Sequence, residues 1–185
     1  MDIFISYSLT GLKTRVYSIP LVIIPYKTAG SSQSESSQIK NEKDTPVTYA
    51  NFEKLALGSA LKEAEDLLGK AKKISDMEGG VIYAWDGNDM SSISVIVKDD
   101  QIIEKNQTDL ADRKAQLTPE ALGQIQDGMT LDQVKAILGD PAITREAKTD
   151  DGKAEVLYEW KQADGAAVTL VAVDGQTVAI DKPAV

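Results

Sequence analysis

The chain contains one segment twice, and this internal repeat is the feature that most constrains its fold. The stretch GMTLDQVKAILGDP begins at Gly128, and the related stretch GSALKEAEDLLGKA begins 70 residues earlier, at Gly58. Further along, the strand-like segments that end at Trp85 and Trp160 match with a shift of 75 residues. A repeat of this period predicts two copies of one supersecondary unit, because a single unit is too small to bury a large core alone.

Each copy opens with signals for a short helix. Thr48 and Thr118 are N-cap candidates, since a threonine hydroxyl accepts a hydrogen bond from an otherwise unpaired N–H of the first turn. Pro119 suits the first helical position, where no N–H is needed. We expect Gly58 and Gly128 to end these helices, because glycine adopts the left-handed conformation without steric cost.

A second helix is predicted directly afterwards in each copy. Thr130 and Gln133 have the spacing of a capping box, and Ser59 is the cap candidate in the first copy. The apolar residues that follow recur at helical spacing, which indicates one buried face. Gly69 and Gly139 are expected to end these helices.

The hydrophobic period then changes from helical to alternating, which predicts strands. The segments VIYAW, ISVIV and QIIEK follow one another in the first copy, and VLYEW, VTLVAV and QTVAI in the second. Asp174-Gly175 predicts a tight hairpin. We therefore expect an α+β fold, a tandem repeat of helix-helix-antiparallel β-sheet units with three strands each. The segment REAKTDDGKAE is interpreted as an insertion in the second copy.

The N-terminal part has a different character. A basic flank, the apolar stretch VYSIPLVIIPY and a polar tract follow one another in the order of a secretory leader, although two prolines interrupt the apolar run. We interpret residues 1–29 as a leader-like or artificial extension and residues 30–46 as a flexible polar tether. The first repeat then spans 47–108, a linker 109–116 and the second repeat 117–182.

Composition excludes several classes of function. The formal net charge is −9, so a nucleic-acid partner is not expected, because phosphate contacts need clustered basic residues. The chain has no histidine and no cysteine. This removes imidazole acid–base chemistry, the common nucleophile pairs and thiolate or imidazole metal sites. No pattern for a phosphate-binding loop or a calcium loop is complete. We therefore predict no catalytic residues, no metal site and no cofactor.

Aromatic residues on the predicted strands leave two alternatives open. Tyr83, Trp85, Tyr158 and Trp160 share one face by alternation. This face packs under the helices, or it is exposed and anchors a protein partner, for which tyrosine and tryptophan are well suited. The turn after Trp85 adds polar candidates for partner binding: Asp86, Asn88 and Asp89.

The repeated unit resembles the β-lactamase inhibitor protein (BLIP-like) family. The resemblance is carried by ALGQIQDGMTLDQVKAILGDP followed by YEW, and by the weaker first copy, and it covers residues 47–182. It extends to Gram-positive lipoproteins of inhibitor type and, more distantly, to SmpA/OmlA-type envelope lipoproteins. The lipoprotein cysteine and the disulfides of the secreted inhibitor are absent from this sequence.

The resemblance implies an exported, non-enzymatic protein that binds a β-lactamase or another envelope protein through its sheet face. In the inhibitor, a hairpin of the first repeat carries an aspartate into the enzyme's active site, and the corresponding turn here is 86–89. The resemblance also implies an extracellular or cell-surface location, with membrane contact only through an N-terminal anchor. An envelope scaffold or assembly factor is the alternative function.

Overall fold

The computed structural model describes residues 46–112 and 114–184. The predicted leader 1–29 and nearly all of the predicted tether 30–46 lie outside these residues. The described helices and strands are α1 (Tyr49–Lys54), α2 (Leu61–Leu68), β1 (Lys72–Met77), β2 (Gly80–Asp86), β3 (Ser92–Lys98), β4 (Gln101–Thr108), α3 (Pro119–Gln124), α4 (Leu131–Leu138), β5 (Ala142–Lys148), β6 (Ala154–Lys161), β7 (Ala167–Val173) and β8 (Gln176–Asp181). Within this part of the chain, no helix is long and apolar enough to cross a lipid bilayer.

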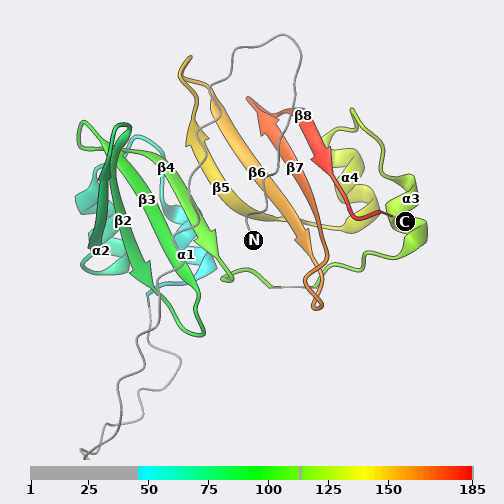
Figure 1. Ribbon diagram of the computed structural model, residues 1–185, viewed down its shortest axis with the longest axis horizontal. Coiled ribbons are helices and arrows are strands. Elements are labelled where there is room, and N and C mark those ends of the chain that lie inside the picture. Colours follow the sequence, from blue (N-terminus) through cyan, green and yellow to red (C-terminus); the bar gives the residue numbers. More distant parts are fainter. Residues whose placement is uncertain (1–45, 113, 185) are drawn as a thin grey trace, which may run out of the picture. The chain divides into compact units, whose positions relative to one another are not determined.

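All eight strands form one antiparallel sheet in which they follow each other in sequence order (Figure 1). Each neighbouring pair is antiparallel. The predicted α+β class is confirmed. We call the part from α1 to β4 the first half and the part from α3 to β8 the second half.

The prediction of three strands per copy is wrong, because each half contains four. The additional strands are β1 and β5, whose sequences KKISDM and AITREAK do not alternate between apolar and polar residues. The segment REAKTDDGKAE is not an insertion. It supplies the end of β5, the turn that follows and the start of β6.

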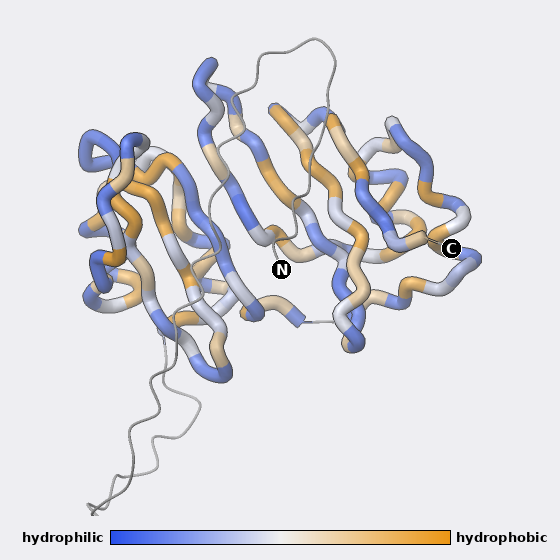
Figure 2. The backbone as a smooth tube through the Cα atoms, in the orientation of Figure 1, coloured by the Kyte–Doolittle hydropathy of each residue, from blue (hydrophilic) through white to orange (hydrophobic). Residues whose placement is uncertain are grey.

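Two apolar cores lie against the same face of the sheet. The first combines Phe52 of α1 and Leu68 of α2 with Trp85, Ile93 and other residues of β2–β4. The second combines helix and strand residues of the second half, among them Leu122, Val134, Trp160, Val168 and Leu170. Figure 2 shows apolar positions alternating along β3 and β7, the strands that supply the buried residues at the base of each core.

The predicted helix starts are confirmed at three positions. The hydroxyls of Thr48 and Thr118 accept hydrogen bonds at 3.2 Å from the N–H groups of Asn51 and Ala121. At α4, the Thr130 hydroxyl accepts from the N–H of Gln133, and the Gln133 side chain accepts from the N–H of Thr130 at 2.8 Å. Both halves of the capping box are therefore formed.

Two predicted helix signals are wrong. Helix α1 ends at Lys54, so Gly58, with φ of 90°, lies in the turn after it rather than at its end. Gly128 likewise follows α3 only after an intervening turn. Ser59 does not cap α2, since its hydroxyl donates to the carbonyl of Ala56 at 2.8 Å. The glycines directly after α2 and α4 do end those helices, with φ of 85° and 81°.

The hairpin predicted at Asp174-Gly175 is confirmed. Both residues have positive φ, 48° and 77°. This is the conformation that two-residue hairpins of the right-handed twist require.

Candidate protein-binding surface

The two tryptophans are core residues. Trp85 is 4% exposed and Trp160 is 2% exposed, each beneath the helices of its own half. The Trp85 indole Nε1 donates to the carbonyl of Gly69 at 2.6 Å, and Trp160 Nε1 donates to the carbonyl of Gly139 at 2.7 Å. Each indole therefore satisfies a carbonyl at the end of a helix. The alternative in which the tryptophans lie on an exposed face is wrong.

The two tyrosines lie on the same, helix-covered face. Tyr83 and Tyr158 are half-buried and pack against the first and second core. Burial raises the pKa of the Tyr158 hydroxyl, and the nearby Glu146 carboxylate adds to this effect. Alternation correctly groups the four aromatic residues, but it does not say which side of the sheet the helices cover.

The turn between β2 and β3 presents polar side chains to solvent. Asp86, Asn88 and Asp89 are exposed, and Asp86 pairs with Lys72 of β1. Asp89 and Met90 both have positive φ, 49° and 66°. Met90 is 92% exposed, and the sequence offered no signal for it, because its apolar type is not typical of a hairpin tip.

Hydrogen bonds within this turn fix its shape. The N–H of Gly87 donates to the carbonyl of Ser91 at 2.8 Å, and the Ser91 hydroxyl donates to the carbonyl of Asn88 at 2.5 Å. A Cβ at Gly87 would collide with the Ser91 hydroxyl. The turn therefore holds its exposed residues in one arrangement.

The opposite face of the sheet is the larger candidate surface. Among the described residues no helix packs on it, since the helical members of both cores lie on the other side. One row of cross-strand partners, which we call the open-face row, crosses all eight strands. Its members are Lys72, Ala84, Ser94, Asn106, Arg145, Leu157, Val171 and Ala179.

The open-face row has a polar centre and apolar flanks. Except for the exposed Lys72, its members are half-buried. At the centre, Arg145 donates to Glu104 at 2.8 Å and pairs with Glu155. Burial opposes the arginine charge, but the two carboxylates outweigh it and raise the pKa of Arg145. The sequence analysis did not select these residues, because each lies between the apolar or aromatic positions that alternation emphasises.

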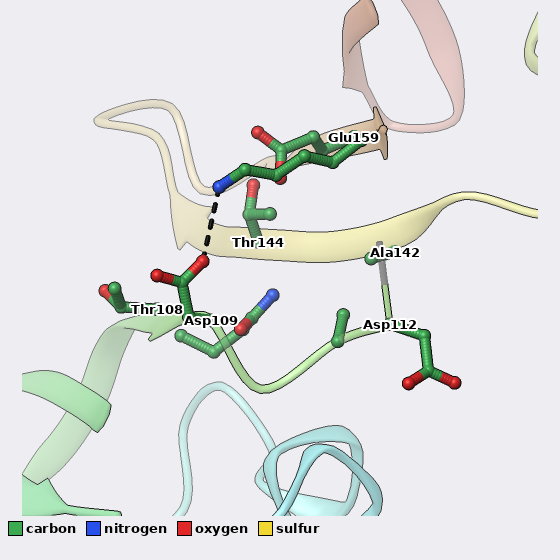
Figure 3. A pocket seen from close by; sticks show the side chains of 9 residues that line it. Thr108, Asp109, Asp112, Ala142, Thr144 and Glu159 are labelled. Atoms are coloured by element: carbon green, nitrogen blue, oxygen red, sulfur yellow. Dashed lines mark hydrogen bonds and ion pairs between the residues drawn. The ribbon is translucent and has the colours of Figure 1, made fainter. Parts of the chain in front are cut away.

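A small polar cavity lies where β4, β5 and β6 end or begin (Figure 3). Its volume is about 200 Å³, below the roughly 300–1,000 Å³ of most small-molecule sites. The ammonium of Lys161 lies 3.2 Å from Asp109, and Thr144 and Glu159 also line the cavity. None of the seven predicted partner-binding residues lines it. No group of acidic side chains in the described residues is arranged to hold a metal ion. The extended open face and the β2–β3 turn are therefore the candidate site.

An α+β protein with one face of its sheet covered by helices and the other free of them is built to present a broad surface. Comparison with known families identifies the chain more closely. A model of the family described as β-lactamase inhibitor (BLIP) matches residues 48–161. The chain belongs to this family, as its repeated segment predicted.

Solved structures give the same fold. A crystal structure of a candidate β-lactamase inhibitor protein from Streptococcus mutans aligns with a TM-score of 0.52 and 13% sequence identity. The alignment covers 72% of this chain and 93% of that chain. A search of curated proteins gives no match.

Proposed function

We propose that this protein is a non-enzymatic binding module that inhibits a serine β-lactamase or a related acyl enzyme by protein–protein contact. Membership of the inhibitor family over residues 48–161 is the observation that carries the proposal. The contact surface would combine the open face with the β2–β3 turn. The half-buried apolar flanks of the open-face row and the exposed Met90 support this choice, since apolar residues ringed by polar ones are typical of interfaces.

We further propose that the chain consists of two copies of one unit. Two pairs of contacts support the duplication. Trp85 and Trp160 each donate to the glycine carbonyl that follows the second helix of their half. Lys105 and Lys182, each from the end of a half, donate to the last carbonyls of α1 and α3. A second unit widens the sheet without adding a new fold.

The third part of the proposal is the place of action. A β-lactamase is met outside the cytoplasm, so the protein would act there after export through its N-terminal leader. Secretion of the full-length chain by a Gram-positive host, followed by sequencing of the mature N-terminus, tests this part. Recovery of the uncleaved chain in the cytoplasm alone would contradict it.

Binding is tested by calorimetric titration of purified serine β-lactamases and penicillin-binding proteins with the full chain. We expect saturable binding with one-to-one stoichiometry to at least one enzyme. The absence of binding to every enzyme at micromolar protein would contradict the proposal. If the chain instead forms a stable complex with structural envelope proteins, the scaffold function takes its place.

A further inference from the structure

The two halves of the sheet meet at β4 and β5 through the shortest ladder in the sheet. Its registered pairs are Glu104 with Ala147, Lys105 with Glu146, and Asn106 with Arg145. Figure 2 shows hydrophilic residues along both of these strands, in contrast to β3 and β7. We call this junction the seam.

The apolar cores do not continue across the seam. The buried members of the first core all come from the first half, and those of the second core all come from the second half. Ile143 is the one partly buried residue of the second half that packs against the first core. Apolar burial therefore stabilises each half separately, and polar groups must hold the halves together.

On the helix-covered face, a buried lysine crosses the seam. Lys105 of β4 is 1% exposed, and its ammonium lies 3.0 Å from Glu146 of β5. The same ammonium donates to the carbonyls of Phe52 and Leu55 at the end of α1, at 3.2 and 2.7 Å. A lysine has three N–H donors, so this set of acceptors uses all of them. A buried charge that is fully paired in this way tolerates little displacement of its partner.

On the open face, an arginine crosses the seam in the opposite sense. Arg145 of β5 pairs with Glu104 of β4 and also with Glu155 of β6. Asn106 donates to the other oxygen of Glu104 at 2.9 Å and holds that carboxylate in place. The first half thus contributes a cation to one face and an anion to the other, and the second half supplies the complement.

Beyond the ladder, side chains replace backbone pairing. The β5 strand is irregular between Ile143 and Arg145, where the ladder to β4 stops. The N–H of Ile143 donates to the Tyr49 hydroxyl at 2.7 Å, and the Ile143 carbonyl accepts from the Gln107 side chain at 3.3 Å. Both backbone groups of Ile143 are therefore satisfied by side chains of the first half.

We propose that the seam is a polar docking interface between two separately cored half-sheets, with the second half as the partner that it fits. The pairs Lys105–Glu146 and Glu104–Arg145 set its register, since a shift of one residue would move each charge to the wrong face. The seam opens locally while both cores remain folded. This inference does not depend on the proposed inhibitory function.

The test is amide hydrogen exchange of the full chain, resolved by residue with NMR, for the wild type and for Arg145→Glu. The variant places three carboxylates together on the open face. We expect exchange of the amides that β4 and β5 share to accelerate about tenfold or more, while amides within β3 and β7 keep their protection. The matched control is Lys153→Glu, which reverses a charge in the exposed β5–β6 turn. It should leave the seam unchanged.

Equal acceleration across β3, β7 and the seam would overturn the proposal, because it would place both halves in one cooperative unit. Unchanged exchange at the seam would overturn it as well. If Arg145→Glu does not fold, Arg145→Lys decides the question. Lysine keeps the charge but cannot bridge two carboxylates with a planar fork. Its effect should be smaller and confined to the same amides, and a uniform effect would count against the seam.

Discussion

At the scale of single residues, the same indole contact occurs in each half. Trp85 and Trp160 fill the space beneath the helices and donate to the carbonyls of Gly69 and Gly139. A tryptophan is therefore required twice over, for its volume and for its N–H group.

Trp160 variants separate these two contributions. We expect Trp160→Ala to lower the free energy of unfolding by about 3–5 kcal/mol, through the lost apolar contacts and the cavity. Trp160→Phe should lower it by about 1–3 kcal/mol, since the Gly139 carbonyl loses its donor. Urea unfolding measures both. Met90→Ala, at an exposed position, is the control and should change stability by less than about 0.5 kcal/mol. Wild-type stability of Trp160→Ala would show that the residue is not a core residue.

Tyr49 gives a prediction for alkaline pH. Burial raises the pKa of its hydroxyl, the hydrogen bond from the N–H of Ile143 partly offsets this, and the carboxylates of Glu53 and Glu146 add to the rise. The folded pKa thus exceeds the unfolded value of about 10. The resulting stability is fully present below pH 10 and is lost as the pH rises through the folded pKa.

Chemical unfolding of wild type and Tyr49→Phe between pH 8 and about 11.5 checks this sign. The difference between the two proteins removes the contribution of the lysines, which both retain. We expect the wild type to lose more stability above pH 10 than Tyr49→Phe does. Parallel curves would mean that Tyr49 ionises equally well in the folded and unfolded chain.

At the scale of elements, local signals predict helix starts where a side chain has no competing partner. Thr130 caps α4 because its hydroxyl faces the N–H of Gln133. Ser59 has a similar position in the sequence, but the turn at Ala56–Gly58 directs its hydroxyl to the carbonyl of Ala56.

These two residues form a matched pair for mutation. Thr130→Ala should destabilise the protein by about 1 kcal/mol, the usual effect of losing an N-cap. Ser59→Ala should change stability by less than about 0.5 kcal/mol, because no helix N–H loses its acceptor. Thermal and urea unfolding of both variants provide the comparison. An equal loss at the two sites would contradict the assignment of the caps.

Strands β2, β3, β6 and β7 were predictable because each buries alternate apolar residues. Strands β1 and β5 were not. All six residues of β1 are exposed at the edge of the sheet, so no apolar alternation is needed there. Strand β5 lies inside the sheet, but its ion pairs to β4 and β6 place Arg145 and Glu146 where an apolar residue would be expected. Such pairing depends on residues distant in the chain, which local sequence does not reveal.

At the scale of the whole molecule, the candidate site was predicted only in part. The exposed turn at Asp86–Asp89 was found from its sequence, and its role in binding remains a prediction. The aromatic residues were grouped correctly, but they lie on the covered face. The open face was missed, because its residues carry no motif and acquire a common surface only through the register of eight strands.

The central claim is that the open face, rather than the helical surface, binds and inhibits an enzyme. It is tested most directly by the inhibition of serine β-lactamases by the wild type, Thr169→Arg and Ala136→Arg. Thr169 is half-buried on the open face between Glu159 and Asp181, so an arginine is tolerated there but projects into a docked partner. Ala136 is exposed on α4. We expect inhibition by the wild type and Ala136→Arg, with at least about a tenfold loss for Thr169→Arg. No inhibition of any enzyme, or equal inhibition by all three proteins, would contradict the account.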